Sequence, residues 1–559
     1  ENLNLHMHQA EELAGIVATK YPVFNVNKIY LDSYQLIQVP QGSRFPDVNK
    51  AINHAVAKGC LILNYTGHGG EDGWAGEKAL TIADIKGWKN FEKLPVFITA
   101  TCEFSRFDNP ERYTAGEMVL MQPDGGAIAL YSTTRLALST SNFRLDSSFF
   151  MNMIPDSAGA VIPKMGDLIR ISKNNNGNNN NIRNFVLLGD PAQEIAYPKY
   201  FIKTTQINEG PVRATADTAL GLSLVKVKGE VNDNLGNKIS GYNGTLFPKV
   251  YDKPTVETTL GNTSDSYPEK FEALKTILYE GKSTISKGEF EFSFVIPKSI
   301  SLQFGKGKIS YYAKDSVSDA WGFYNNIVIG GNDPTINPVN PGPDFSLYMN
   351  NTAFKNGDMT NNHPDLLAFI NDPNGVNFTG VGIGHEIIAY LDEDMVHPII
   401  LNDYFTPDMD QYTGGKVLYP MQNLANGRHT IRVKAWDFYN NPAEKSIFFF
   451  VSEIPESGVQ QVMNFPNPVM DHTTFQFVST QNRGKLNVKI EIANQIGRIV
   501  KTLSATFPDG GGPTVTIPWN GTGEGGARLS AGLYVYRLQV NRENGTFFQA
   551  SQKLVIGAQ

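Results

Sequence analysis

Two short segments of the sequence each place a reactive side chain directly after an apolar run. The first is Leu61–Gly70 (LILNYTGHGG), which carries His68, and the second is Val96–Glu103 (VFITATCE), which carries Cys102. A histidine beside a thiol can take its proton, and the thiolate that results is the nucleophile of cysteine-dependent acyl transfer. The two segments therefore predict Cys102 as a catalytic nucleophile, with His68 as its general base and acid.

Glycines on both sides of the histidine add a second catalytic element. Gly67, Gly69 and Gly70 allow a tight turn and a close approach of the backbone to a ligand. The backbone amides of Gly69 and Cys102 are candidates for an oxyanion hole, in which preorganised donors stabilise developing negative charge. Alternatives remain for each residue alone, because a single cysteine after an apolar run is usually a small core residue. A histidine in a glycine-rich turn is often only a turn residue.

The surrounding elements predict an α/β domain with a parallel sheet. Helices are expected at His8–Lys20 and Val48–Lys58, and a short strand at Val26–Leu31. Apolar runs without alternation, typical of strands buried on both faces, occur at Cys60–Tyr65, Pro95–Ala100, Ala127–Tyr131 and Phe185–Leu188. Parallel strands end at one edge of a sheet and neighbours lie about 4.8 Å apart, so His68 and Cys102 are expected side by side. A domain of this class should begin with a strand, so we expect part of it upstream of residue 1.

Three other residues are weighed for roles at this edge. Arg135 follows the third apolar run and could contact substrate, although it could equally be a surface arginine. Asp190 follows the fourth run and is expected to cap a turn. Cys60 begins its strand, far from the edge where the strands end, and is expected to be structural.

The rest of the chain has the character of β modules joined in series. We expect the α/β domain at residues 1–203, a β-sandwich at 204–331, a linker with four prolines at 332–344, a second sandwich at 345–454 and a third at 455–559. Short alternating runs separated by Asn-Gly, Asp-Pro and Gly-Asn turns are the basis for these modules.

Composition excludes several classes of protein. The chain has 559 residues, 18% of them charged, and a net charge of −7, which argues against a nucleic-acid binder. Two cysteines are too few for a disulfide scaffold, and no apolar run is long enough to span a bilayer. No cysteine or histidine cluster has zinc spacing, and no cofactor is expected. The acidic run 392–394 and the turn at Asp372 could bind structural calcium, although solvated acidic turns are commoner.

Several motifs resemble one family. The segments Tyr65–Gly70 (YTGHGG) and Thr99–Phe104 (TATCEF), whose His68 and Cys102 are 34 residues apart, are similar to those of the gingipain family of cysteine peptidases. The segments Asn4–Glu11 (NLHMHQAE), Asp372–Asn377 (DPNGVN) and Gly382–His385 (GIGH) resemble the PorU-like sortases of the type IX secretion system. Asn464–Pro468 (NFPNP) and Ala531–Tyr536 (AGLYVY) resemble the C-terminal signal domain of cargo exported by that system.

The resemblance implies a caspase-like (gingipain-like) α/β domain followed by Ig-like β-sandwiches. It implies that Cys102 and His68 carry catalysis, and that an acidic residue upstream orients the histidine. Glu12 is a candidate together with Glu11, and a residue upstream of residue 1 is the alternative. Such sortases act at the cell surface, in association with the outer membrane. They remove the C-terminal signal domain of type IX cargo, transfer the cargo to anionic lipopolysaccharide, and dock on the outer-membrane barrel PorV through their own C-terminal domain.

Two other functions stay open. One is a secreted gingipain-like protease, in which water replaces the amine acceptor. The other is a non-catalytic surface protein, in which the α/β part is only a scaffold and the sandwiches bind partners. An intact His68–Cys102 pair favours an enzyme, since a degenerate scaffold need not keep it.

Overall fold

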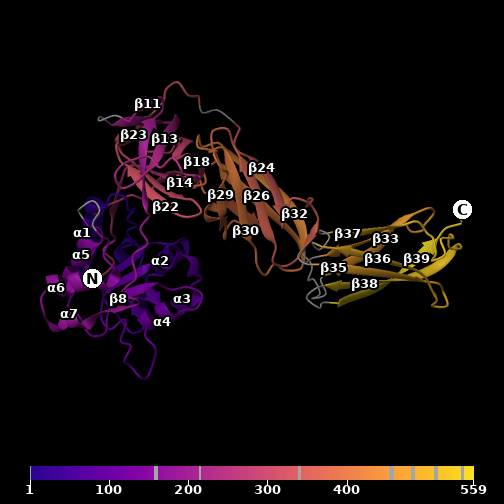
Figure 1. The fold of residues 1–559 in the computed structure, drawn as a ribbon, viewed down its shortest axis with the longest axis horizontal. Coiled ribbons are helices and arrows are strands. Elements are labelled where there is room, and N and C mark those ends of the chain that lie inside the picture. Colours follow the sequence, from indigo (N-terminus) through magenta and orange to yellow (C-terminus); the bar gives the residue numbers. More distant parts are fainter. Residues whose placement is uncertain are drawn as a thin grey trace.

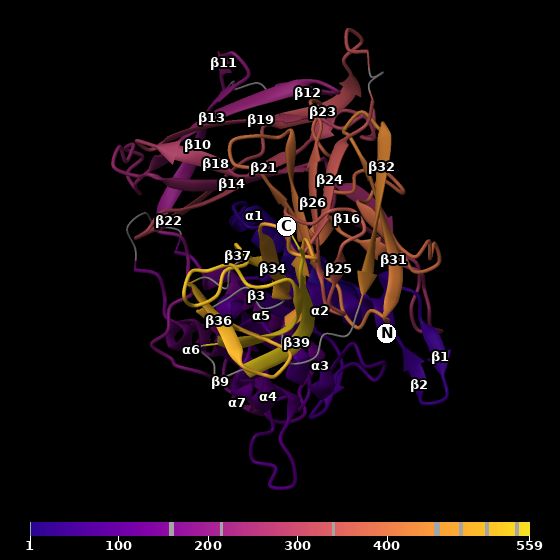
Figure 2. The same cartoon turned by 90° about the vertical axis from the view of Figure 1, so that its right-hand side faces the viewer.

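The computed structural model shows an α/β domain followed by β modules in series (Figure 1). It describes residues 2–155, 161–212, 216–337, 341–451, 459–479, 485–508, 514–542 and 547–558. The α/β domain, indigo to magenta in Figure 1, packs beside the first β module, and the later modules extend from there towards the C-terminus. The view in Figure 2 places the C-terminal module in front, at the end of this row. The predicted α/β class with following β domains is confirmed.

The catalytic candidates belong to a four-stranded sheet in the order β3-β7-β8-β9. Its strands are β3 (Ile62–Thr66), β7 (Val96–Ala100), β8 (Ala129–Thr133) and β9 (Phe185–Leu188). The first three are parallel, as predicted, but β9 runs antiparallel to β8. Asp190 therefore lies at the opposite edge from Cys102, where its carboxylate accepts the Ala192 amide at 2.8 Å and caps a turn.

Helices cover both faces of this sheet because its strands alternate apolar side chains between two cores. Ile98 of β7 packs in one core and Phe97 in the other, and both are fully buried. The helices are α1 (Leu5–Lys20), α2 (Pro46–Lys58), α3 (Ile82–Gly87), α4 (Ala115–Met121), α5 (Ser139–Asn152), α6 (Met165–Asn175) and α7 (Asn180–Asn184). The first core takes side chains from α1, α5 and α6, and the second from α2, α3 and α4. None of the helices in the described ranges is long and apolar enough to cross a membrane.

Smaller elements join these parts. They are the short helices η1 (Leu31–Ser33) and η2 (Phe91–Lys93), the hairpin β1 (Ile37–Val39) with β2 (Gly42–Arg44), and the ribbon of β4 (Gly69–Gly70), β5 (Gly73–Trp74) and β6 (Leu80–Thr81). This ribbon follows His68 directly and pairs antiparallel throughout.

The prediction of a strand at Val26–Leu31 is wrong. Residues 25–30 have no regular structure and run between α1 and the first β module. Two of their side chains bond to α1: Lys28 Nζ lies 2.6 Å from Glu11 Oε1, and the Tyr30 hydroxyl donates to Glu11 Oε2 at 2.6 Å. Lys28 Nζ also donates to the Glu272 carbonyl of the first β module at 2.7 Å. An apolar pattern alone could not show that this segment has no strand beside it to pair with.

The first β module closes on itself. In its nine-stranded sheet, β22 pairs with both β21 and β10, so the sheet surrounds a single core. Its strands are β10 (Tyr200–Ile207), β11 (Gly210–Pro211), β12 (Asp217–Gly221), β13 (Leu224–Asn232), β14 (Gly244–Tyr251), β15 (Thr255–Thr258), β16 (Lys270–Ala273), β17 (Ile277–Glu280), β18 (Ser283–Ser286), β19 (Glu289–Val295), β20 (Gly305–Lys306), β21 (Lys308–Lys314), β22 (Asp319–Tyr324) and β23 (Ile327–Asn332). The β15–β16 hairpin stands apart from the closed sheet as a sheet of its own.

The second and third β modules each contain two sheets around one core. The second contains η3 (Asn402–Tyr404) and the strands β24 (Asp344–Met349), β25 (Met359–Thr360), β26 (Asp365–Asn371), β27 (Ile388–Leu391), β28 (Ile399–Ile400), β29 (Phe405–Pro407), β30 (Gly414–Pro420), β31 (Gly427–Trp436) and β32 (Pro442–Val451). The third contains β33 (Val459–Phe465), β34 (Thr473–Ser479), β35 (Leu486–Ala493), β36 (Ile499–Phe507), β37 (Thr514–Trp519), β38 (Gly532–Arg542) and β39 (Phe547–Ile556). The expected boundary at 454/455 and residues 338–340 of the expected linker lie outside the described residues.

Candidate active site

The register of the parallel sheet brings the segments of His68 and Cys102 together. Thr66 at the end of β3 is the partner of Ala100 at the end of β7. The Gly67 amide donates to the Ala100 carbonyl at 3.3 Å, which continues the pairing beyond β3. His68 and Cys102 each follow two residues after this matched pair, so both leave the sheet at the same edge and the same level.

An aromatic pair fixes the turn that carries His68. Tyr65 and Trp74 stack with ring centroids 4.4 Å apart and an interplanar angle of 7°. The Tyr65 hydroxyl donates to the His68 carbonyl at 2.7 Å, and the Trp74 indole donates to Thr99 Oγ1 at 3.1 Å. Because Tyr65 belongs to β3 and Thr99 to β7, the stacked rings connect the histidine turn to both strands.

Gly69 lies directly against the residue that precedes the nucleophile. A Cβ built at this position would lie 2.6 Å from Thr101 Oγ1 and 2.9 Å from the Gly73 carbonyl oxygen, closer than a side chain can approach. The Ala75 amide donates to the His68 carbonyl at 2.9 Å, so the following pair, Gly69 with Trp74, is of the non-hydrogen-bonded kind. The Gly69 amide therefore points away from β5, as an oxyanion donor must.

Cys102 is half-buried at the start of a sharp turn. Its thiol lies 3.5 Å from both the carbonyl oxygen and the amide nitrogen of Ala137. Glu103, the next residue, has a φ of 51°, in the left-handed region that non-glycine residues rarely adopt, and its amide donates to the Arg135 carbonyl at 3.3 Å. The thiol must turn away from Ala137 to give its proton to His68. The Ala137 contact had no signal in the sequence.

His68 is exposed, and its imidazole contacts the N-terminal segment. Asn2 Nδ2 lies 3.0 Å from His68 Nε2 and 3.3 Å from His6 Nε2. The His6 and His68 rings meet edge to face with centroids 5.1 Å apart. Burial, and then the neighbouring His68, lower the pKa of His6. His6 is therefore neutral around pH 7.

The structure does not bring Glu12 to His68. Glu12 lies on α1 with an exposed side chain, and it forms no hydrogen bond or ion pair with any residue in the described ranges. Glu11, the other acidic candidate, bonds to Lys28 and Tyr30. Among the described residues of the N-terminal segment, Asn2 and His6 contact the histidine, and sequence reasoning missed both because neither is acidic.

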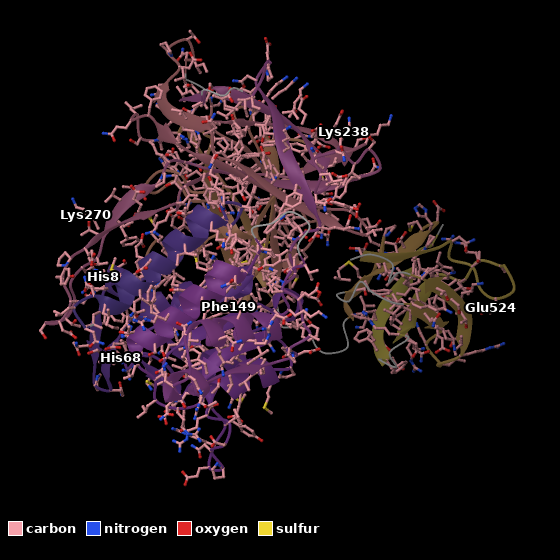
Figure 3. The ribbon with its side chains drawn as sticks, turned by 60° about the vertical axis from the view of Figure 1, so that its left-hand side comes forward. His8, His68, Phe149, Lys238, Lys270 and Glu524 are labelled. Atoms are coloured by element: carbon pink, nitrogen blue, oxygen red, sulfur yellow. The ribbon has the colours of Figure 1, made fainter. Side chains whose placement is uncertain are left out.

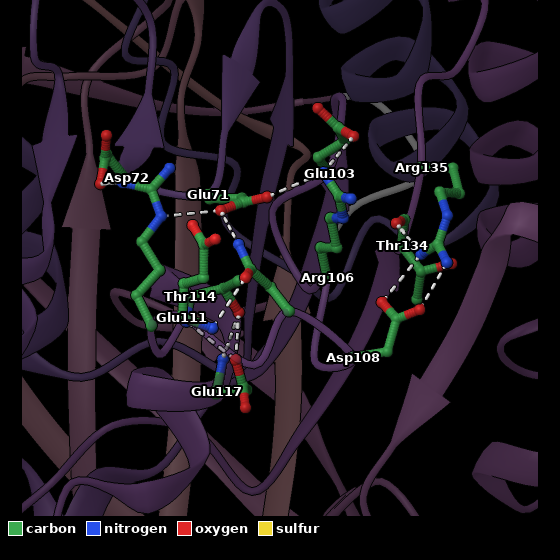
Figure 4. Close-up of polar contacts among 12 residues, drawn as sticks. Glu71, Asp72, Glu103, Arg106, Asp108, Glu111, Thr114, Glu117, Thr134 and Arg135 are labelled. Carbon is green, nitrogen blue, oxygen red and sulfur yellow. Dashed lines mark hydrogen bonds and ion pairs between the residues drawn. The ribbon is translucent and has the colours of Figure 1, made fainter.

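A buried carboxylate ties the turn after Cys102 to the ribbon after His68 (Figure 4). Glu71 is 8% exposed and receives bonds from Arg112 Nε at 2.7 Å, Asn109 Nδ2 at 2.8 Å and Arg106 Nη1 at 3.2 Å. Arg106 also reaches Glu103 Oε1 at 3.4 Å. The bond from Arg112 is the main cause that lowers the pKa of Glu71. The network fixes the loop that follows the nucleophile.

Arg135 forms an exposed ion pair with Asp108 on the same loop (Figure 4). Its Nη1 donates to Asp108 Oδ1 at 3.0 Å, and a second bond joins the two side chains. The Arg135 side chain is therefore that of a surface arginine, the second of the two roles considered for it. Its backbone carbonyl accepts the Glu103 amide and so supports the turn after Cys102.

Cys60 lies just before β3, at the end of the strand opposite His68. Burial raises the pKa of its thiol to about 11, and both cysteines are free. A cavity of about 710 Å³ extends along β3 from Cys60 to His68 and is also lined by His6 and Trp74. The two thiols therefore lie in different environments, as expected.

The acidic run of the second β module binds basic side chains. Asp392 lies 2.7 Å from His429 Nδ1, Glu393 lies 2.7 Å from Arg432 Nη2, and Asp394 lies 2.9 Å from His397 Nδ1. Asp372 is buried, which raises the pKa of its carboxyl to about 6. Within the described ranges, no three potential metal-ligating side chains gather into one group.

Comparison with known proteins gives a family for the α/β part. Residues 2–196 match the model of peptidase family C25. The crystal structure of dimeric latent PorU from Porphyromonas gingivalis is 24% identical over 99% of this chain and 50% of that chain, with a TM-score of 0.35. The complex of the pro- and mature domains of Porphyromonas gingivalis RgpB is 13% identical over 56% of this chain and 63% of that chain, with a TM-score of 0.29.

A third similar structure is the Arg-specific cysteine proteinase gingipain R, 13% identical over 58% of this chain and 62% of that chain, with a TM-score of 0.29. No curated protein sequence matches the chain. The chain spans half the length of the PorU chain that it matches.

Proposed function

Residues 2–196 belong to peptidase family C25, the gingipain family of cysteine peptidases, and from this premise we propose that the chain is a cell-surface sortase. It removes the C-terminal signal domain of type IX secreted cargo and transfers the cargo to anionic lipopolysaccharide. The observation that carries the catalytic part is the register of Thr66 with Ala100, which sets His68 level with Cys102. The resemblance of the last module to a cargo signal domain supports the substrate class.

The first half of the reaction forms a thioester. His68 takes the Cys102 thiol proton, and Sγ attacks the carbonyl carbon of the peptide bond that joins the cargo to its signal domain. Negative charge develops on the carbonyl oxygen, and the amides of Gly69 and Cys102 stabilise it. When the tetrahedral intermediate collapses, the C–N bond breaks, the leaving amine takes the proton from His68, and the signal domain departs.

The second half transfers the cargo. An amine of the acceptor attacks the thioester carbonyl, His68 takes a proton from that amine, and the Cys102 thiolate leaves as a new amide forms. Protonation of the thiolate by His68 restores the enzyme. Attack by water on the same thioester would make the enzyme a hydrolase, so the outcome depends on which nucleophile reaches the thioester first.

The C-terminal module is the proposed docking element on an outer-membrane barrel of the PorV kind. Its two sheets end in the edge strands β33, β37, β36 and β39, and edge strands pair readily with other chains. Apolar side chains are exposed on three of them, including Phe465 at 73%, Ile499 at 48% and Phe547 at 53%. Association with the outer membrane then follows from docking.

The test is to incubate the protein with a cargo that bears its signal domain, with and without an added amine, and to identify the products by mass spectrometry. A sortase gives cargo joined to the amine and a released signal domain, while Cys102→Ala gives neither. Cargo that ends in a free carboxylate despite excess amine would make the enzyme a protease. An unprocessed cargo, with Cys102 alkylated no faster than Cys60, would leave only the binding function.

A further inference from the structure

The Cys102 sulfur lies against the backbone of Ala137, a residue that follows the neighbouring strand β8. Its Sγ is 3.5 Å from both the carbonyl oxygen and the amide nitrogen of Ala137. A thiol can donate its proton to the carbonyl, but a thiolate has no proton and can only accept. The amide is therefore the group that still bonds to the sulfur once His68 has taken the proton. The position of Ala137 then affects how readily the thiolate forms.

Ala137 belongs to the segment 134–138, which runs beside the turn that carries the nucleophile. Two residues of this segment bond to that turn. The Arg135 carbonyl accepts the Glu103 amide at 3.3 Å, and the Ala137 backbone contacts Cys102 Sγ. In extended backbone, successive residues direct their amides and carbonyls to opposite sides. The even-numbered residues of the segment therefore bond on the side away from the nucleophile.

Two asparagines of α7 hold that side. Asn184 Nδ2 donates to the Leu136 carbonyl at 2.9 Å, and the Asn184 carbonyl accepts the Thr134 amide at 2.9 Å. Asn181 Oδ1 accepts the Leu138 amide. The residues immediately before and after Ala137 are therefore both bonded to α7.

The helix α7 begins at the end of a run in which seven of the eight residues 174–181 are asparagine. The structure distinguishes members of this run: Asn181 is 8% exposed, whereas its neighbour Asn180 is exposed. Asn181 Nδ2 also donates to Asn142 Oδ1 at 3.1 Å. Asn142 lies on α5, whose fully buried Phe149 lies among the helices of the α/β domain (Figure 3). Asn181 thus links the core of the domain to the segment beside the nucleophile.

We propose that Asn181 and Asn184 are positioning residues of the nucleophile, which hold Ala137 where its amide donates a hydrogen bond to the Cys102 thiolate. The inference rests on the proposed cysteine-peptidase chemistry of Cys102. When the S–H bond turns from the Ala137 carbonyl towards His68 and the proton leaves, the amide bond to the sulfur remains and becomes stronger, because its acceptor is now charged. The same amide stabilises the thiolate when it leaves the thioester in the second half of the reaction.

The test compares Asn181→Ala, Asn184→Ala, Asn181→Asp and the control Asn180→Ala with the wild type, using the full chain. The first readout is the rate of Cys102 alkylation by iodoacetamide as a function of pH, with Cys60 of the same sample as a reference thiol. The second is kcat and KM for cleavage of a cargo that bears its signal domain. Thermal unfolding of each variant checks that it is folded.

Asn181→Ala and Asn184→Ala should move the midpoint of the Cys102 pH profile upward by about one pH unit, because a hydrogen bond to a charged sulfur is weakened. Alkylation below the midpoint then slows about tenfold, and kcat falls by about the same factor with KM unchanged. Cys60 should react as it does in the wild type. A role confined to folding would leave the pH profile of Cys102 where it is.

The conservative variant and the control separate the hydrogen bond from general effects of substitution. Asn181→Asp should recover most of the wild-type profile, because its carboxylate accepts the Leu138 amide and the Asn142 amide can turn to donate to it. Asn180→Ala should match the wild type, since this side chain is exposed.

Wild-type pH profiles in Asn181→Ala and Asn184→Ala would overturn the inference, even if kcat fell, and so would an equal shift in Asn180→Ala. If Asn181→Ala does not fold, the half-buried Asn184 decides through its own variant. A wild type that leaves the cargo intact would show the proposed substrate to be wrong. The pH profile of Cys102 would still decide the inference, since alkylation needs no cargo.

Discussion

Gly69 offers a sharp test of how the histidine turn is positioned, because its neighbour Gly70 provides the control. An alanine Cβ at 69 would lie 2.6 Å from Thr101 Oγ1, which is 0.8 Å short of the 3.4 Å at which ordinary contact begins. Thr101 is 1% exposed and cannot turn aside into solvent. At Gly70 a Cβ would meet nothing within 4 Å. Gly69→Ala must therefore push the turn away from β7, whereas Gly70→Ala need not.

The expected cost has a catalytic part and a structural part. A displacement approaching 1 Å between nucleophile and base commonly lowers the rate by about 100-fold. At 1.36 kcal/mol for each factor of ten, this corresponds to about 2.7 kcal/mol of transition-state stabilisation. The added methyl in a packed contact should also lower the free energy of unfolding by about 1–3 kcal/mol.

The assay is the second-order rate of Cys102 alkylation, followed by peptide mass spectrometry, together with cargo cleavage and thermal unfolding. Gly69→Ala should lower the cleavage rate strongly, while Gly70→Ala should stay within about twofold of the wild type, as surface changes usually do. The double variant Gly69→Ala/Thr101→Ala removes the closest atom and should recover part of the loss. An equal loss in both single variants, or no loss in Gly69→Ala, would refute the reasoning.

Three other predictions concern the two cysteines, the ion pairs of Glu71 and the C-terminal module. Cys102→Ala should abolish cargo processing, whereas Cys60→Ala should leave it near normal, and Cys60 should be alkylated slowly because burial raises its thiol pKa to about 11. Arg112 lowers the pKa of Glu71, so the ion pairs stabilise the fold above the unfolded-state value of about 4.3 and are lost as pH falls through the lower folded value. Denaturant unfolding between about pH 5 and pH 3 should therefore show a steeper loss of stability in the wild type than in Glu71→Gln. Deletion of residues 459–559 should release the protein from the outer membrane but leave Cys102 alkylation unchanged. A truncated protein that stays on the outer membrane would contradict the docking role, and a folded truncation that loses thiol reactivity would contradict the separation of docking from catalysis.

Local pattern was enough to predict the parts of the site that lie on buried strands. The apolar runs before His68 and Cys102 are neighbouring parallel strands, of which β7 is fully buried and β3 is half-buried at the edge of the sheet. Parallel pairing necessarily brings their ends to one edge. The same reasoning failed at Asp190, because an apolar run carries no information about strand direction and β9 is antiparallel. It failed at Val26–Leu31 as well, since a strand needs a partner as well as a pattern.

The supports of the site depend on contacts that no sequence spacing reveals. Glu71 follows two glycines in the sequence, where nothing distinguishes it from other polar loop residues. In the structure it is buried and bonded to Arg106 and Arg112 of the loop that follows the nucleophile. Polar residues are common in loops, so their types do not identify which of them meet. Which carboxylate bonds to which guanidinium group depends on how the chain folds, and only the structure shows it.

The position of His68 depends on two modules. Within the α/β domain, the Tyr65–Trp74 stack and the close approach of Gly69 to Thr101 fix the backbone of the turn. The imidazole itself is held by Asn2, whose own backbone is bonded to Asp265 of the first β module. These partners are 66 and 263 residues away from Asn2 in the chain, so the sequence gives no sign that they meet. A β module next to a peptidase domain is commonly regarded as a spacer, but this one is bonded, through the loop of its β15–β16 hairpin, to Asn2, which contacts the imidazole of His68. A change in how the hairpin sits on α1 would therefore alter the orientation of the general base while the Cys102 turn stayed as it is.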